Sequence, residues 1–295
     1  MSKIIKAWIE AMRLRTLPVS IAGVLTAVGF NIADDTFKCA PAILCLVFAL
    51  LCQIASNFAN EYFDYRAGRD RAGREGPRRG VTEGDISPAA MFKATFLVLC
   101  LAALAGLALT YWGGAWLIAV GVVVFIGAVA YSAGPYPLST HCLGEVSVII
   151  FFGIVPVTLT YYLQALQWSL SVIAASVAIG LMGANVLVIN NYRDIDDDRA
   201  VGKHTLATNL PKWAMPALYM ANAAVAVLLM LPAWLAMSYW TLVIPLAYLG
   251  AAAAITRRMT AVKGHHLNPL LGMTAMSMFA YSLFFLLINI YTKAS

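Results

Sequence analysis

Long apolar stretches separated by short polar segments dominate this chain. A helix needs roughly 20 mostly apolar residues to cross the hydrocarbon core of a bilayer. Nine stretches come close enough to that length for us to predict a transmembrane helix in each: residues 16–33, 41–62, 91–111, 115–133, 144–165, 169–190, 212–233, 239–256 and 268–291. The pattern therefore predicts an all-α integral membrane protein whose nine helices form a bundle.

Composition indicates the same class of protein. The chain of 295 residues is 61% hydrophobic and only 12% charged, whereas about a quarter of the residues of a soluble globular protein are charged. No separate soluble domain or low-complexity linker is visible in the sequence. We therefore predict a single domain over residues 1–295.

The distribution of Lys and Arg predicts the orientation of the helices. If the N-terminus lies in the cytoplasm, only Lys38 and Lys293 of the 20 basic residues fall in outside segments, which leaves 18 inside. Because cytoplasmic loops are enriched in basic residues, we predict a cytoplasmic N-terminus, an outside C-terminus and a location in the inner (cytoplasmic) membrane. The net charge of +6 then reflects topology, and nucleic-acid binding is not expected.

Polar side chains gather at the predicted cytoplasmic ends of the second and sixth helices. Residues three, four or seven apart share one face of a helix, so each set forms a stripe. The stripes consist of Gln53, Asn57, Asn60, Glu61 and Asp64 in one helix and of Asn190, Asn191, Asp194, Asp197 and Asp198 in the other. Since Mg²⁺ prefers oxygen ligands together with substrate phosphates, the stripes predict a Mg²⁺ site facing a central cavity open to the cytoplasm. Helix capping at the interface is the plain alternative.

A segment suited to phosphate follows each stripe. Residues 68–80 combine glycines, which allow close backbone approach, with arginines, which make bidentate contacts to phosphate. Residues 199–205 include Lys203, close in sequence to Asp198. Basic loops also arise from membrane topology alone, so this alternative stays open for each arginine. Glu145, at the start of the fifth predicted helix, either interacts with the helix dipole or lies near a substrate.

At these residues the chain resembles the UbiA superfamily of intramembrane aromatic prenyltransferases. Members carry an NDxxDxxxD-like motif after the second of nine helices. Asn60, Glu61 and Asp64 match this motif, although Glu61 replaces the commoner Asp. Gly68 stands where a third acidic residue often lies, and Asp70 follows two positions later.

The second motif and its neighbours look like one branch of that superfamily. Asp194 and Asp198 match the DxxxD-like motif that members carry after the sixth helix. Residues 57–70, 76–80 and 190–205 look like the corresponding segments of the menaquinone-pathway branch, which prenylates 1,4-dihydroxy-2-naphthoate. The resemblance covers essentially the whole chain in the layout of its helices.

The resemblance implies a Mg²⁺-dependent transfer of a polyprenyl group from polyprenyl diphosphate to 1,4-dihydroxy-2-naphthoate, with loss of CO₂ and diphosphate, giving demethylmenaquinol. Metal and cations would ease departure of the diphosphate, and the ring would attack the allylic carbocation. Alternatively, Asp194 would orient or deprotonate the phenol. The implied catalytic residues are Asp64, Asp194 and Asp198; the implied metal ligands are these three with Asn60, Glu61, Asp70 and Asn190; the implied diphosphate ligands are Asn57, Arg78, Arg79, Arg193 and Lys203.

Three alternatives stay open at this point. The nearest keeps the chemistry but uses another acceptor, namely 4-hydroxybenzoate, homogentisate or haem. A cation-coupled transporter would need acidic residues at mid-membrane depth, whereas nearly every carboxylate here lies at one edge of the predicted bilayer. A CDP-alcohol phosphotransferase would carry a DGxxAR signature, which the chain lacks.

Overall fold

The computed structural model describes residues 2–70, 76 and 78–294. In this part of the chain there is no β-strand, only an isolated parallel bridge between His141 and His204. The helical elements are α1 (Lys3–Met12), η1 (Leu14–Thr16), α2 (Leu17–Ala33), α3 (Cys39–Arg66), α4 (Pro88–Gly113), α5 (Leu117–Ala130), η2 (Leu138–Thr140), α6 (Gly144–Val148), η3 (Ile149–Ile154), α7 (Val155–Ala165), α8 (Leu170–Arg193), α9 (Ile195–Ala200), α10 (Leu206–Asn209), α11 (Ala214–Met237), η4 (Tyr239–Leu242), α12 (Val243–Ala261), η5 (Gly264–Leu267) and α13 (Asn268–Ala294).

Eight helical segments of the described chain are long and apolar enough to cross a membrane, and they contain eight of the nine predicted stretches. The remaining stretch, residues 115–133, forms α5, an apolar helix of 14 residues. That is shorter than a crossing normally requires. The all-α architecture with several membrane helices is thus confirmed, while the ninth crossing stays a prediction. Helix α1 lies before the first predicted stretch and was not expected.

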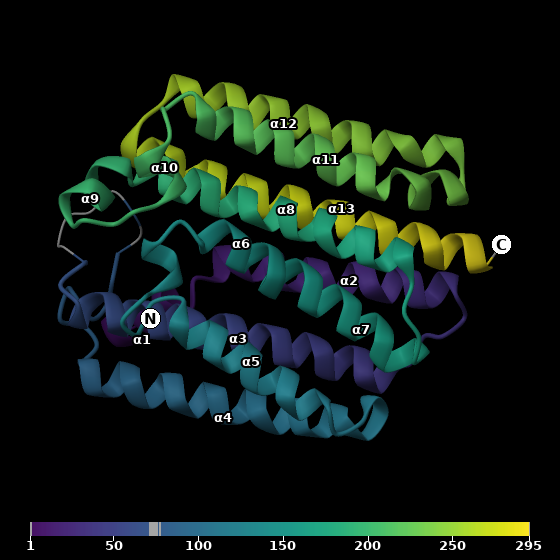
Figure 1. Ribbon diagram of the computed structural model, residues 1–295, viewed down its shortest axis with the longest axis horizontal. Helices are drawn as coiled ribbons and strands as arrows, with labels where there is room; N and C mark the ends of the chain where they lie inside the picture. Colours follow the sequence, from purple (N-terminus) through teal and green to yellow (C-terminus); the bar gives the residue numbers. More distant parts are fainter. Residues whose placement is uncertain (1, 71–75, 77, 295) are drawn as a thin grey trace.

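The long helices run side by side, with α3, α4 and α5 at one margin of the bundle and α11 and α12 at the other (Figure 1). Helix α8 is central, because it packs against α11, α13, α7 and η3. Its alternation of Ala, Gly, Ile, Met and Val keeps most of its surface buried. This position sets the end of α8 facing the end of α3 across the middle of the bundle.

A close backbone approach joins η3 to α8. Element η3 is a π-helical turn that comes just before Pro156, whose ring and missing N–H disfavour a continuous α-helix. A Cβ atom added at Gly153 would lie 2.3 Å from the carbonyl oxygen of Ser176 and 2.4 Å from the Cα of Gly180. Small residues at a helix contact allow such an approach between backbones. The two glycines therefore fix the distance between these elements.

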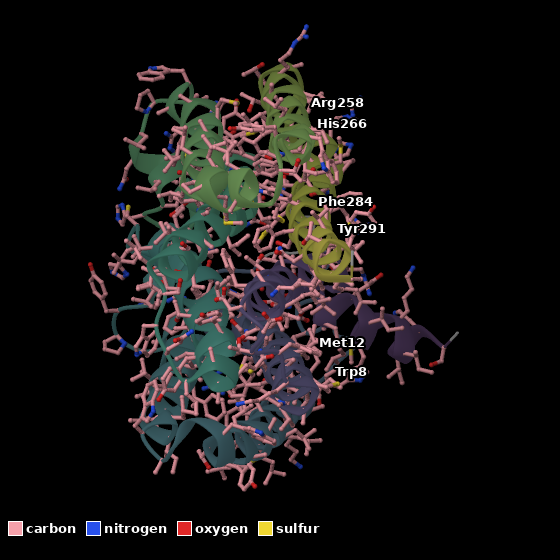
Figure 2. All side chains as sticks on the ribbon, turned by 90° about the vertical axis from the view of Figure 1, so that its right-hand side faces the viewer. Trp8, Met12, Arg258, His266, Phe284 and Tyr291 are labelled. Carbon is pink, nitrogen blue, oxygen red and sulfur yellow. The ribbon has the colours of Figure 1, made fainter. Side chains whose placement is uncertain are left out.

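Helix α1 is a short helix of 10 residues that packs against α3. Its Ala7 and Ala11 are buried in a small apolar cluster with Phe58 of α3. The ring of Trp8 meets that of Phe58 edge to face at 5.5 Å. Figure 2 shows Trp8 and Met12 where α1 meets the other helices. The end of α1 is thereby held close to the end of α3.

We predict that Gly153→Ala destabilises the protein by about 2 kcal/mol, because the new methyl group would overlap backbone atoms that cannot move aside. The measurement is the thermal unfolding midpoint of the purified protein in detergent. Gly250→Ala is the matched control, since a Cβ atom at this helical position meets nothing within 4 Å. Equal midpoints for the two variants would contradict the proposed role of the η3–α8 contact.

Candidate active site

Helices α3 and α8 end on the same side of the bundle, near α9 and α10 (Figure 1). A cavity of about 170 Å³ lies between these helix ends, and we call it the polar cavity. Its lining includes members of both predicted stripes together with three basic residues: Arg13, Gln53, Asn57, Asn60, Asp64, Arg79, Asn190, Asn191 and Lys203. The fold thus brings the two stripes, about 130 residues apart in sequence by counting from Asn60 to Asn190, to one cavity.

Asn60 is the point at which several segments of the site meet. Its Oδ1 accepts hydrogen bonds from Arg13 Nη2 at 2.6 Å and from Arg79 Nη2 at 2.9 Å. Its Nδ2 donates to Ser132 Oγ at 2.8 Å. Arg13 follows α1 with a left-handed backbone (φ 53°), and Arg79 belongs to the loop after α3. One side chain therefore links the N-terminal segment, α3, that loop and the end of α5.

Asp64 lies one turn further along α3 and is almost fully buried at the wall of the polar cavity. Its Oδ1 is 3.4 Å from Arg69 Nη1, which also donates to the carbonyl oxygen of Ser132 at 3.2 Å. Asp70 lies beyond Arg69 and forms an ion pair at 3.4 Å with Arg79 Nε. The carboxylates of this segment are thus paired with guanidinium groups, as charges removed from water require.

The side chains of Glu61 and Asn57 both contact the backbone of neighbouring segments. The carboxylate of Glu61 is directed to the loop after α3, where its Oε1 accepts from the backbone N–H of Val81 at 3.0 Å. Asn57 lines the polar cavity, but its Nδ2 donates to the carbonyl oxygen of Met12 at 3.0 Å. Both side chains therefore hold neighbouring backbone. Residues 71–75 and 77 of the predicted phosphate segment lie outside the described residues.

In the second stripe, the two asparagines are the residues that reach the polar cavity. Asn191 is buried, and its Nδ2 donates to Glu145 Oε1 at 2.9 Å, across from α6. Asn190 Oδ1 accepts from Arg193 Nη2 at 2.8 Å. Glu145 thus supports the wall of the cavity through Asn191, a contact that sequence spacing alone did not indicate.

Arg193 and Asp194 form a buried bidentate ion pair with each other. Arg193 Nε lies 2.6 Å from Asp194 Oδ1, and Nη2 lies 2.8 Å from Oδ2. The guanidinium group also donates to Asn268 Oδ1 of α13 at 2.7 Å. Neither Arg193 nor Asp194 lines the polar cavity. In this arrangement the pair joins α8 to α13 behind the cavity wall.

Asp198 and Lys203 close the second segment into a compact turn. Lys203 Nζ is 3.4 Å from Asp198 Oδ1, and the Lys203 N–H donates to the carbonyl oxygen of Asp198 at 2.9 Å. Gly202, between them, adopts φ 70°, a conformation that favours glycine. Lys203 reaches the polar cavity, whereas Asp196 and Asp197 are exposed. The turn therefore presents one cation to the site.

Arg78 lies outside the polar cavity and ties α1 to the loop after α3. It forms an ion pair with Asp85 and lies 3.7 Å from Glu10 Oε2. Asp85 also accepts from Lys3 Nζ at 2.8 Å. The hydrogen bond from Lys3, reinforced by Arg78, holds the pKa of Asp85 below its ordinary value. These ion pairs, centred on the largely buried Asp85 side chain, orient α1, and with it Arg13, over the cavity.

A second cavity, of about 270 Å³, continues from the first into the apolar part of the bundle. We call it the apolar cavity. Its walls come from α3, α4, α5 and the α6–η3–α7 segment, and include Cys52, Phe48 and Leu107. Both cavities share Gln53, Ser56, Tyr131, Val148 and Phe152, so they meet directly. The site is therefore a polar chamber joined to an apolar one.

No three His, Cys, Asp or Glu side chains cluster closely enough within the described residues to form a metal site on their own. The oxygen-bearing side chains that line the polar cavity are instead mixed, and include the carboxylate of Asp64 and the amides of Asn60 and Asn190. Arg13 also lines the polar cavity, although the sequence did not predict a role for it in the site. Its only signal was its place just before an apolar stretch, which does not reveal that its guanidinium group reaches α3.

Named relatives align with most of the chain. The sequence is 36% identical over 276 residues to the 1,4-dihydroxy-2-naphthoate octaprenyltransferase of Mycobacterium tuberculosis, covering 94% of each protein. It is 36% identical over 214 residues to the protein of the same name from Haemophilus influenzae, covering 70% of each. The names of both relatives describe octaprenyl transfer to the naphthoate.

Solved structures with the same fold come from archaea. A UbiA homolog from Aeropyrum pernix, in its apo state, has a TM-score of 0.68 at 18% identity, over 89% of this chain and 96% of that one. A UbiA homolog from Archaeoglobus fulgidus, bound to GPP and Mg²⁺, has a TM-score of 0.67 at 15% identity, over 95% and 99%. In addition, residues 17–283 match the UbiA prenyltransferase family as a whole. The chain belongs to the UbiA prenyltransferase family.

Proposed function

We propose that this protein transfers a polyprenyl group from polyprenyl diphosphate to 1,4-dihydroxy-2-naphthoate, releasing diphosphate and CO₂ and giving demethylmenaquinol. One observation supports this most: a polar cavity rich in cations and oxygen donors adjoins an apolar cavity, with which it shares five lining residues. A polyprenyl diphosphate has the same division into a charged head and a long apolar tail. The relatives from M. tuberculosis and H. influenzae carry this activity in their names, which favours the naphthoate as acceptor.

Three basic side chains of the polar cavity are suited to hold the diphosphate: Arg13, Arg79 and Lys203. Guanidinium groups bind phosphate oxygens through two parallel hydrogen bonds. Arg79 is buried, and its Nη1 has no hydrogen-bond acceptor among the described residues. A buried donor without an acceptor lowers the stability of the folded protein, because it has lost its hydrogen bonds to water. The diphosphate would supply the missing acceptor beside the ion pairs that Arg79 makes with Asp70 and Glu61, whereas Arg78 and Arg193 lie outside the polar cavity.

The donor set at the polar cavity fits Mg²⁺. Asn60, Asp64 and Asn190 present oxygen atoms to it, and Mg²⁺ typically takes one or two carboxylates together with substrate phosphates and water. We propose these three as ligands; Asp194 and Asp198 of the second stripe would join them by exchanging Arg193 and Lys203 for the metal. Bound Mg²⁺ neutralises charge on the diphosphate and so makes its departure easier.

The chain's own residues would control the reaction around the breaking bond. The allylic C–O bond breaks with its electron pair on the diphosphate, where the arginines and Lys203 stabilise the charge. Tyr131 and Phe152 lie where the two cavities meet, so their ring faces are placed to stabilise a developing allylic cation. The naphthoate ring forms the new C–C bond, and its carboxyl group leaves as CO₂. The apolar walls exclude the water that would otherwise trap the cation.

We propose that the whole of residues 1–295 forms one catalytic domain in the cytoplasmic membrane, with nine crossings and the polar cavity facing the cytoplasm. The basic residues support this orientation, because Arg13, Arg79 and Lys203 lie at the cavity end, whereas Lys38 and Lys293 belong to the opposite ends of their helices. Helix α5 would then cross as the ninth span, with the turns on either side of it completing the crossing.

We predict that Asp64→Ala lowers prenyl transfer by about a hundredfold or more, because the cavity loses the carboxylate that holds metal against the diphosphate. The assay follows radiolabelled polyprenyl diphosphate into product with purified protein, Mg²⁺ and the naphthoate. Asp196→Ala is the matched control, since Asp196 is exposed and lies outside the cavity. An active Asp64→Ala enzyme with an unchanged unfolding midpoint would rule out the proposed metal site.

We predict that polyprenyl diphosphate with Mg²⁺ slows alkylation of Cys52 by about tenfold, because the prenyl tail fills the apolar cavity that Cys52 lines. The measurement is the rate of modification by a small apolar thiol reagent, read by peptide mass spectrometry. Cys39 is exposed at the start of α3 and serves as an internal control. Inorganic pyrophosphate, which has no tail, should leave the rate at Cys52 unchanged. Equal rates with and without the prenyl compound would place the tail elsewhere.

A further inference from the structure

Glu61 sits between two cavity residues in the sequence motif but does not face the cavity itself. Its side chain is 1% exposed, and it belongs to the lining of neither cavity, whereas its neighbour Asn60 lines the polar one. Successive residues on an α-helix point about 100° apart. Since Asn60 and Asp64 share the cavity face one turn apart, Glu61 is turned toward the loop that follows α3.

Both oxygens of the Glu61 carboxylate are directed to that loop. Oε1 accepts from the Val81 N–H at 3.0 Å, and Oε2 lies 4.0 Å from Arg79 Nη1. These contacts bracket Gly80, where an added Cβ atom would lie 3.4 Å from Glu61 Oε1 and 2.9 Å from a side-chain carbon of Ile86. The loop therefore passes in van der Waals contact with Glu61, and a larger residue at position 80 would have to displace the end of the Ile86 side chain.

The loop is otherwise held by a tight turn. The Gly80 carbonyl oxygen accepts from the N–H groups of Asp85 and Ile86 at 2.9 and 3.0 Å. This turn fixes residues 80–86 relative to one another. The Glu61 side chain attaches this segment to α3 by accepting from the Val81 N–H. Arg79 lies two residues before Val81, and its side chain points from the loop toward α3. Its Nη2 reaches Asn60 Oδ1 at 2.9 Å, at the wall of the polar cavity.

We propose that Glu61 is a positioning residue for Arg79: its carboxylate fixes the loop at Val81 and balances the guanidinium charge, so that Arg79 is aimed at the diphosphate end of the polar cavity. This inference rests on the proposed function for the identity of the anion. It differs from the metal-ligand role that the motif predicts for Glu61. Aspartate, one methylene shorter, would not span from α3 to both the Val81 N–H and Arg79.

The test compares the binding of two probes to purified protein in detergent. Inorganic pyrophosphate with Mg²⁺ reports on the anion site by calorimetry, and Mn²⁺ followed by electron paramagnetic resonance reports on the metal site. Glu61→Gln keeps an oxygen for the Val81 N–H but presents an amide N–H₂ to Arg79. We expect its pyrophosphate affinity to fall about tenfold, as for one lost charge-assisted contact, with Mn²⁺ affinity unchanged. Glu83→Gln, an exposed glutamate in the same loop, is the matched control and should change neither.

A double-mutant cycle decides whether Glu61 acts through Arg79. If it does, Glu61→Gln has no further effect on pyrophosphate affinity in an Arg79→Ala background. An equal loss in both backgrounds, or a loss of Mn²⁺ affinity like that of Asp64→Asn, would overturn the inference and favour direct metal ligation. Glu61→Asp provides a second variant and should reproduce the loss of pyrophosphate affinity.

The inference and the proposed function fail in different ways. These probes contain neither a prenyl tail nor an aromatic acceptor, so the cycle gives its answer without any turnover. Protein that shows the expected coupling but never transfers a prenyl group would support the role of Glu61 and refute the proposed reaction. Protein that binds pyrophosphate with no coupling between Glu61 and Arg79, yet transfers the prenyl group, would do the reverse.

Discussion

Neutralising buried charge at the end of an apolar helix bundle is the constraint on which the rest of this structure depends. A carboxylate or guanidinium group removed from water is tolerated only when it is paired and hydrogen-bonded. Asp64 with Arg69 and Arg193 with Asp194 are both paired and hydrogen-bonded, and Asp70 forms an ion pair with Arg79. The three arginines also donate to other segments, at Ser132, Asn60 and Asn268, so the charged groups help to hold the walls of the site together.

The same pairing explains why the site is assembled from so many segments. Asn60 accepts from two arginines that arrive from opposite directions, one after α1 and one after α3. The amide oxygen can accept both hydrogen bonds because it has two lone pairs. It is neutral, so it leaves the positive charge of the two arginines in place. A diphosphate would offer these arginines a stronger partner and would free the oxygen of Asn60. Cations are thus held ready at the cavity by a weak acceptor, while close packing at Gly153 and Gly180 keeps α8 in place opposite them.

Sequence reasoning captured the parts that depend on long patterns. Apolar runs predicted nine membrane helices, of which eight are long and apolar enough to cross in the described chain, and helical spacing brought Asn60 and Asp64 to one face. It was less successful where one residue's direction or one helix's length decides the outcome. Helix α5 is shorter than its apolar run, Arg13 reaches the site only because α1 packs beneath the loop, and Glu61 points away from a cavity that its neighbours line. Such details depend on contacts between segments far apart in sequence, which spacing within one helix does not encode.

The most direct test of the central claim is a prenyl-transfer assay with purified protein, Mg²⁺ and a single polyprenyl diphosphate. It offers 1,4-dihydroxy-2-naphthoate and 4-hydroxybenzoate in parallel reactions and measures both prenylated product and released CO₂. The account predicts prenylated product with an equal amount of CO₂ from the naphthoate, and none from the benzoate. Product from the benzoate alone would contradict the proposed acceptor, and no product from either would contradict the proposed reaction.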